Sequence, residues 1–245
     1  ARTSQVWRVP EVYRATPRVI EMEYVEGAVN ISRAVQHFRP ADPLAYRRDL
    51  ASKFLFTILS QLFVYQELHG DLHPGNVMVD RAGRLHLIDW GNTVQLAGKV
   101  MPALDYLKGA LVADVDLLTD ALIAISTEPE AAQARRGEIR EALARTLHKK
   151  QIRPLSYTFA WTLYREGPEG WLKRANTLLQ LASNTQQLGL VLRGEYLHLS
   201  RSLTAMIATL GGLYEGVPRW RAGADLLIAI NTFPARALKD YLRGV

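Results

Sequence analysis

Hydrophobic residues recur at three- and four-residue steps through the segment from Leu44 to Leu68. This spacing places them on one face of a helix, so we predict a single long helix that buries this face in a core. The predicted stripe consists of Leu50, Phe54, Ile58, Leu62 and Tyr65. The helix would lead the chain directly into the segment that begins at His69.

Two other patterns favour extended structure. Arg18 to Gly27 begins as an apolar run and ends in a glycine break, which predicts a strand followed by a linker. Further along, the apolar runs Val77–Val79 and Leu85–Ile88 flank the turn-rich residues 80–83. We predict that these two runs form a hairpin.

Helical patterns dominate the rest of the chain. The sequence therefore predicts an α+β protein that is mainly α. A short helix is expected from Asn30 or Ser32, which would cap it, to Phe38. The later helices are expected at 101–112, 114–125, 128–149, 157–164, 170–187, 195–213 and 223–242, with breaks at glycine and proline.

Composition narrows the class of protein. The chain of 245 residues is 48% hydrophobic and 22% charged, as expected for a soluble globular protein with an apolar core. It has no cysteine, which excludes disulfides, thiolate metal sites and cysteine nucleophiles. No stretch has the length of a membrane-spanning helix and no signal-peptide pattern opens the chain, so we expect a cytoplasmic protein.

The net charge of +6 arises mainly from two basic clusters, one at 135–153 and one at 219–243. Basic faces can meet anionic lipid, although solvated helix faces are their more common origin. The second cluster alternates with Leu226, Leu227, Ile230 and Phe233, so residues 223–245 could lie at a membrane surface or pack on the protein. The sequence lacks the aromatic-interleaved pattern of a nucleic-acid reader, and no nucleic-acid partner is expected.

The residues best suited to chemistry lie around the predicted hairpin. Asp71 and Asn76 are five residues apart in His-Gly-Asp-Leu-His-Pro-Gly-Asn, and Asp89 opens Asp-Trp-Gly. The spacings resemble the catalytic loop and metal-binding turn of protein kinases, where the first Asp is the base and the Asn and second Asp bind Mg²⁺. An amide oxygen and a carboxylate are hard ligands suited to that ion. The hairpin would carry Asn76 at one end and Asp89 at the other.

Together with Met-Glu-Tyr-Val-Glu-Gly at 22–27, these motifs resemble the UbiB/AarF family of atypical kinase-like proteins. The resemblance implies a kinase-like C-terminal lobe, ATP and Mg²⁺ as cofactors, and a role in isoprenoid-quinone or lipid metabolism at a membrane. It assigns Asp71 to catalysis and Asn76 and Asp89 to the metal.

The same resemblance assigns four residues to the nucleotide. Met22 would lie at the back of the adenine pocket, and the backbone of Glu23 and Val25 would bond the adenine edge. His73 occupies the place of a lysine near the γ-phosphate in many protein kinases. A loop histidine that bonds the backbone is an equally good interpretation of His73, whereas His69 is assigned to packing of the loop.

Departures from the kinase pattern set expectations as well. Gly70 replaces the arginine that reads an activation-loop phosphate, and no Ala-Pro-Glu follows Asp89, which argues against a protein substrate. No glycine-rich phosphate loop precedes Met22 and no lysine precedes Lys53. We therefore interpret 1–29 as a remnant of the small lobe with the hinge and 30–245 as the helical lobe, and expect weak nucleotide affinity from these residues alone.

Two alternatives remain open from the residues. The residues of the loop and of Ile-Asp-Trp-Gly closely resemble the corresponding motifs of aminoglycoside and choline kinases, which act on small molecules. A pseudokinase scaffold, whose basic helices bind a membrane or a partner, would also explain the absence of a phosphate-covering lobe.

Overall fold

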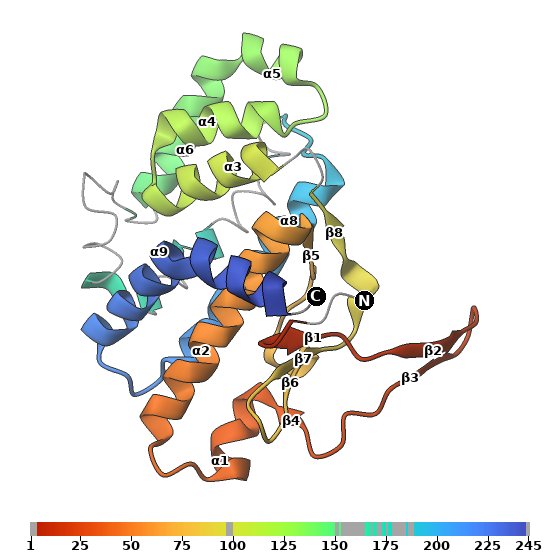
Figure 1. Ribbon diagram of the computed structural model, residues 1–245. Coiled ribbons are helices and arrows are strands. Elements are labelled where there is room, and N and C mark those ends of the chain that lie inside the picture. The colour runs from red at the N-terminus through yellow and green to blue at the C-terminus, as the bar shows by residue number, and fades with distance from the viewer. Residues whose placement is uncertain are drawn as a thin grey trace.

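The computed structural model describes residues 4–96, 100–149 and 189–243, together with 152, 165–167, 169–170, 173–174, 176–177 and 185. Helices form most of the body, and short strands gather on one side of it (Figure 1). The predicted α+β fold with a helical majority is therefore found.

The main sheet has four short strands in the order β1 (Trp7–Arg8), β7 (Leu85–Leu87), β6 (Val77–Val79) and β4 (Val29–Asn30). β1 runs parallel to β7, and the other neighbours are antiparallel. β6 and β7 form the predicted hairpin, whose turn is closed by a hydrogen bond from the Gly83 N–H to the carbonyl oxygen of Asp80 (2.9 Å). Gly83 has a φ of +75°, a conformation that suits glycine because it has no Cβ.

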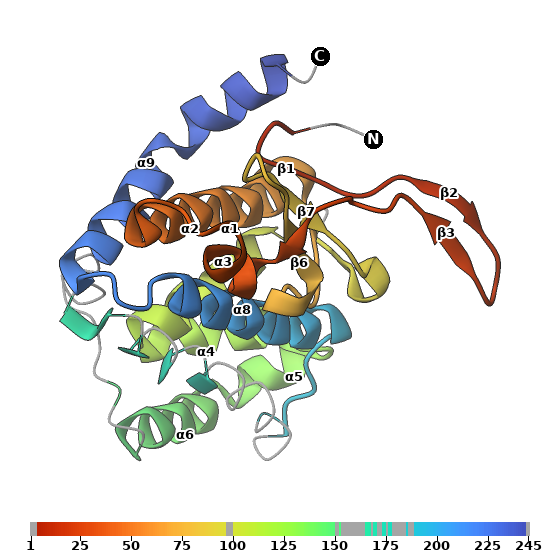
Figure 2. The ribbon, with the colours of Figure 1, turned by 90° about the horizontal axis from the view of Figure 1, so that it is seen from below.

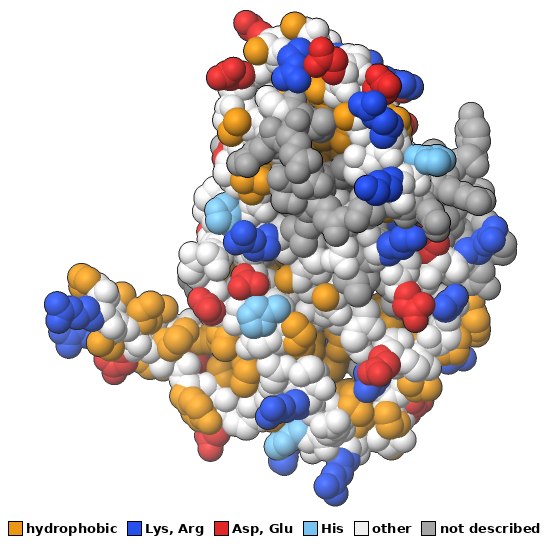
Figure 3. Space-filling model, turned by 180° about the vertical axis from the view of Figure 1, so that it is seen from behind, with side chains coloured by type: hydrophobic (Ala, Val, Ile, Leu, Met, Phe, Trp, Pro, Cys, Tyr) orange, Lys and Arg blue, Asp and Glu red, His pale blue; other side chains and the backbone are white. Residues whose placement is uncertain are grey.

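A second hairpin, β2 (Val12–Ala15) and β3 (Ile20–Met22), extends away from the body (Figure 2). It contains the predicted strand, although β3 is shorter than the apolar run. Its side chains are mostly exposed: Ile20 retains 65% of its accessible surface and Tyr24, just beyond β3, retains 85%. From behind, the hairpin is an arm with many hydrophobic side chains (Figure 3).

The prediction of one helix from Leu44 to Leu68 is correct for its first part and wrong for its end. Helix α2 (Pro43–Leu59) begins at Asp42, whose carboxylate accepts from the Ala45 N–H (2.9 Å). It continues as the π-helix η2 (Ser60–Tyr65), and Gln66 ends it in a left-handed conformation. Strand β5 (Glu67–Leu68) follows because it pairs with β8 (Val94–Gln95), a tertiary contact that local periodicity does not reveal.

The predicted stripe of this segment does face the core. Leu50 and Phe54 are fully buried, and Ile58 and Leu62 each retain 8% of their accessible surface. The short helix predicted to end at Phe38 is found as a 3₁₀ turn, η1 (Ile31–Arg33), followed by α1 (Ala34–Phe38). Asn30 caps it, accepting from the Ser32 N–H (3.0 Å).

The helices after the hairpin largely follow prediction. α3 (Val100–Val112), α4 (Val115–Ala124) and α8 (Gly194–Leu213) match within a residue of the expected bounds. The helix predicted over 128–149 is instead two, α5 (Pro129–Ala134) and α6 (Arg136–Lys149), because Arg135 leaves helical geometry between them. The helix predicted at 157–164 lies outside the described residues, as does most of the one at 170–187.

The last helix, α9 (Arg219–Arg243), crosses α2 (Figures 1 and 2). The ring of Phe233 lies 5.8 Å from that of Phe56, and Arg48 makes two hydrogen bonds with Asp225 (2.8 and 2.7 Å). Packing on the lobe, one of the two interpretations of this segment, is therefore what the structure shows. Among the described helices, none is long and apolar enough to cross a membrane.

Candidate functional site

Asn76 lies at the end of a short 3₁₀ turn, η3 (Pro74–Asn76), where the loop enters β6. Its side chain is largely buried, and Nδ2 donates to the carbonyl oxygen of Asp71 (2.9 Å). This bond fixes the carboxamide and leaves Oδ1 as the group able to bind a cation. Asp71 and Asn76, predicted to act together, are thus joined by a direct contact.

Asp89 is held beside Asn76 by the register of the hairpin. The Ile88 N–H donates to the carbonyl oxygen of Asn76 (3.1 Å), so Asp89 follows directly after the last bond of the ladder. Asp89 has φ +62° and ψ +67°, a left-handed conformation that is uncommon for a residue other than glycine. Residues held in this region cluster at functional sites, which agrees with the predicted role of Asp89.

His69 ties the two parts of the site together. It is fully buried; its Nε2 lies 2.8 Å from the carbonyl oxygen of Ile88, and its Nδ1 accepts from the Asp71 N–H (3.2 Å). This pattern requires the neutral ring with the proton on Nε2. Burial lowers the pKa of His69, against the opposing effect of its bond to Ile88. The predicted packing role of His69 is confirmed.

Gly70 has a steric reason to be glycine. A Cβ placed on it would lie 1.6 Å from the carbonyl oxygen of Asn92, in the turn η4 (Trp90–Asn92) that follows Asp89. The loop from His69 to Asn76 and the Asp-Trp-Gly turn therefore meet backbone to backbone. An arginine at this position could not be accommodated unless the loop or that turn moved.

Helix α8 contacts the backbone of the loop through two hydroxyl groups that the sequence analysis did not identify. The buried Ser202 hydroxyl donates to the carbonyl oxygen of His69 (2.8 Å), and the Thr209 hydroxyl lies 3.2 Å from that of Leu72. The two are seven residues apart, hence on one helical face. Small hydroxyl residues at that spacing within a leucine-rich stripe are the signal that could have found them.

His73 makes a hydrogen bond with the backbone, as one of its two interpretations predicted. Its Nδ1 accepts from the Gly75 N–H (2.9 Å), which caps η3. The opposite nitrogen, Nε2, lies 3.9 Å from Oδ2 of Asp71, and both side chains remain partly exposed. A contact of His73 with a phosphate stays a prediction.

The predicted hinge residues lie on a different segment. Met22 ends β3 and is 39% exposed, and Val25 is half-buried, with its carbonyl oxygen accepting from the Ala28 N–H (3.3 Å). The Glu23 N–H donates to the carbonyl oxygen of Glu11 (2.7 Å). No described contact joins Met22 or Val25 directly to Asp71, Asn76 or Asp89, and their role at the adenine ring stays a prediction.

A chain of polar contacts nevertheless connects the hinge strand with the hairpin. Glu23 pairs with Arg8, whose Nε donates to Nδ1 of His86 (3.2 Å), and Nε2 of His86 lies 2.9 Å from Asp80. His86 is buried, and burial lowers its pKa although the bond to Asp80 opposes this. This series of contacts was not predicted, because its residues come from four separate segments of the sequence.

The metal assignment depends on two side chains rather than a cluster. Within the described residues, no group of three or more His, Asp or Glu side chains could hold a metal by itself. The fixed amide of Asn76 and the strained Asp89 fit an ion that is completed by water and phosphate oxygens, as Mg²⁺ is in nucleotide sites.

Comparison with known proteins identifies the class. Residues 1–115 match the ABC1 atypical kinase-like domain. The matched domain is that of the UbiB/AarF family of atypical kinases, which is the family that the motifs resemble.

The relatives agree with this match. The chloroplastic protein Activity of BC1 complex kinase 1 of Arabidopsis thaliana is 30% identical over 98 residues, which is 37% of this chain and 13% of that protein. An uncharacterized protein of Mycobacterium tuberculosis is 33% identical over 107 residues, 43% of this chain and 20% of its own length. Activity of BC1 complex kinase 8 of Arabidopsis thaliana is 28% identical over 122 residues, 47% of this chain and 15% of that protein.

The chain therefore spans at most a fifth of the length of these relatives. No solved structure matches it.

Proposed function

We propose that this chain carries the catalytic and metal-binding part of an Mg-ATP-dependent atypical kinase or ATPase of the UbiB/AarF type. The observation that carries the proposal is the joining of Asp71, Asn76 and Asp89: Asn76 bonds the backbone of Asp71, and Asp89 follows the residue that bonds the backbone of Asn76. These bonds support the proposal because they join the backbone of the loop that carries Asp71 and Asn76 to the end of the hairpin that leads into Asp89.

In the proposed mechanism, Asn76 Oδ1 and the Asp89 carboxylate would hold Mg²⁺, which would supply positive charge to neutralise the phosphates. Asp71 orients an attacking hydroxyl or water and accepts its proton. His69, neutral and buried, keeps Asp71 in place through the Asp71 N–H. The Glu23 N–H is engaged with Glu11, so the adenine edge would meet the Glu23 carbonyl and the backbone of Val25.

The chemical class of the phosphoryl acceptor is proposed from the family alone. A UbiB/AarF-type protein would support isoprenoid-quinone or lipid metabolism, and a lipid-linked acceptor agrees with the lack of an Ala-Pro-Glu platform for peptides. A peripheral membrane contact is part of this proposal. It draws support from exposed apolar residues on α9, including Ile228 (59%) and Leu242 (66%), beside the basic residues of that helix.

Asp89→Ala is the direct test of the metal assignment. We expect the native chain to bind a fluorescent ATP analogue more tightly with Mg²⁺ than with EDTA, and the variant to lose this difference. Because the readout is the Mg²⁺ dependence, weak overall affinity does not obscure it. Glu130→Ala, which removes an exposed carboxylate on α5, is the matched control and should behave as native.

Asp71→Asn separates catalysis from binding. It should keep Mg²⁺-dependent nucleotide binding and lose turnover by at least about a hundredfold, the usual contribution of a positioned general base.

Mg²⁺-dependent binding that persists in Asp89→Ala would contradict the metal assignment. No binding by the native protein at all would favour the pseudokinase scaffold.

A further inference from the structure

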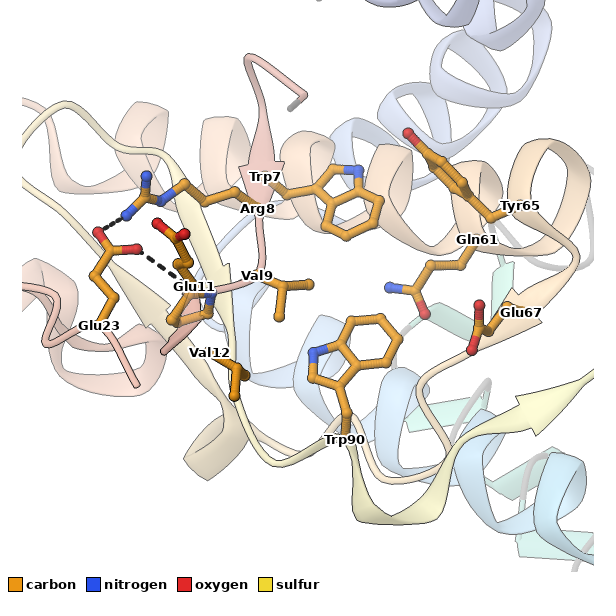
Figure 4. Close-up of a pocket in the computed structure, with 11 residues that line it drawn as sticks. Trp7, Arg8, Val9, Glu11, Val12, Glu23, Gln61, Tyr65, Glu67 and Trp90 are labelled. Carbon is orange, nitrogen blue, oxygen red and sulfur yellow. Dashed lines mark hydrogen bonds and ion pairs between the residues drawn. The ribbon is translucent and has the colours of Figure 1, made fainter. Parts of the chain in front are cut away.

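A cavity of about 890 Å³ lies beside the catalytic loop, between β1 with the residues that follow it and the end of the α2–η2 helix (Figure 4). Its walls include three aromatic rings, Trp7, Tyr65 and Trp90. Asp71, Asn76 and Asp89 are not among its lining residues. The volume falls within the range of pockets that enclose small organic ligands.

One wall carries a buried hydrogen-bond donor. Gln61 is fully buried, and its Oε1 accepts from the His69 N–H (2.7 Å). Exchange of the oxygen and nitrogen of this carboxamide would place two donors against each other, so the bond to His69 fixes its orientation. Nε2 consequently points into the cavity, toward the space between Val9 and Trp90 (Figure 4).

Gln61 Nε2 has no hydrogen-bond partner within the part of the chain that the structure describes. A buried donor that has no partner destabilises the folded state, so native structures rarely keep one without a reason. The indole nitrogen of Trp7 is likewise unpartnered among the described residues, but it lies on the side of its ring turned away from Trp90 (Figure 4). Gln61 is therefore the donor available to a guest.

The walls define what kind of guest fits. Trp7 and Tyr65 meet edge to face with centroids 5.5 Å apart, and the indole N–H of Trp90 donates to the carbonyl oxygen of Leu87 (3.2 Å), so the rings are held in place. They favour an apolar body of ring size. Glu11 and Glu67 also line the cavity and disfavour an anion, whereas the charge of Arg8 is engaged by Glu23.

We propose that this cavity binds an uncharged, apolar small molecule whose carbonyl-type oxygen accepts the hydrogen bond of Gln61 Nε2. The proposal does not depend on the metal assignment. Since the same carboxamide holds the His69 N–H, an acceptor at Nε2 polarises the group and strengthens its bond to His69. Binding of the guest therefore alters the hydrogen bond that Gln61 makes with the backbone of the catalytic loop.

Acetophenone and α-methylstyrene test the proposal as a matched pair, because they differ only by a carbonyl oxygen in place of a methylene group. Each is titrated into the ¹⁵N-labelled native chain and followed by NMR. We expect acetophenone to bind about fivefold more tightly, as one net hydrogen bond implies. It should shift the side-chain amide of Gln61 and the backbone amide of His69.

Gln61→Met keeps the length of the side chain and removes the donor. Both probes should then bind equally, and because the two are compared on the same folded variant, lost stability does not affect the ratio. Gln133→Met, on the exposed face of α5, should keep the fivefold preference. Equal binding of the probes to the native chain, binding of neither, or a preference that survives in Gln61→Met would overturn the proposal.

Discussion

Gly70 is a position at which the site has no room for a side chain. Its Cα faces the carbonyl oxygen of Asn92, and a Cβ would lie 1.6 Å away, well inside any real contact. Because the obstacle is backbone on a second turn, a substitution must displace the loop or the Asp-Trp-Gly turn. We expect Gly70→Ala to lower the free energy of unfolding by about 3 kcal/mol or more, measured by urea denaturation.

A second glycine provides the control. Gly137, near the start of α6, has nothing within 4 Å of the position that a Cβ would take. Gly137→Ala should therefore raise stability by about 0.5 kcal/mol, because alanine favours the helix and restricts the unfolded chain. Effects of the same sign in the two variants would contradict the steric account of Gly70.

At the scale of elements, the junction of α2 with α9 depends on Arg48 and Asp225. The pair is bidentate, and Asp225 is largely buried, with 14% of its side-chain surface exposed. The hydrogen bonds to Asp225 raise the pKa of Arg48, so its guanidinium is charged. A double-mutant cycle with Arg48→Met and Asp225→Asn should give a coupling free energy of about 1.5–3 kcal/mol.

The exposed pair of Arg145 and Glu141 on α6 is the matched control for this cycle. Both side chains are more than two-thirds exposed, and the guanidinium lies 3.6 Å from the carboxylate. Its coupling should be about 0.3–0.5 kcal/mol. If the two cycles give similar values, the α2–α9 pair does not hold the junction.

Sequence patterns predicted these elements where local signals were strong. The hairpin was predictable because two apolar runs flank a turn, and antiparallel pairing of the two runs places Asn76 and Asp89 at adjacent ends. The end of α2 was not, because the π-helix and β5 depend on pairing between Glu67 and Gln95. Gln61 and Ser202 were missed for the same reason: each bonds the loop from a helix that gives no local sign of doing so.

The whole molecule should respond to acid through two buried histidines. Burial lowers the pKa of both His69 and His86 below the value of about 6.5 that they have in the unfolded chain. Below pH 6.5 these two histidines therefore bind more protons in the unfolded chain than in the folded chain. Stability should fall as the pH drops from 6.5 toward the folded-state pKa values, by at most about 1.4 kcal/mol per pH unit for each histidine.

His86→Gln isolates one part of this response. Glutamine can still donate toward Asp80 and accept from Arg8, but it does not titrate. The pH dependence of the unfolding midpoint between 5 and 6.5 should become shallower in this variant, and should stay native in His148→Gln, which changes an exposed residue of α6. An unchanged slope in His86→Gln would show that this ring is not protonated on unfolding in that range.

The close approach at Gly70 also constrains the evolutionary paths open to the protein. Protein kinases that are switched on by phosphorylation read the added phosphate with an arginine at this place in the loop. Here a single codon change to arginine would have to be preceded by a rearrangement of the Asp-Trp-Gly turn, since Asn92 occupies the space. A protein with this loop therefore cannot acquire that mode of phosphate recognition unless the turn moves first.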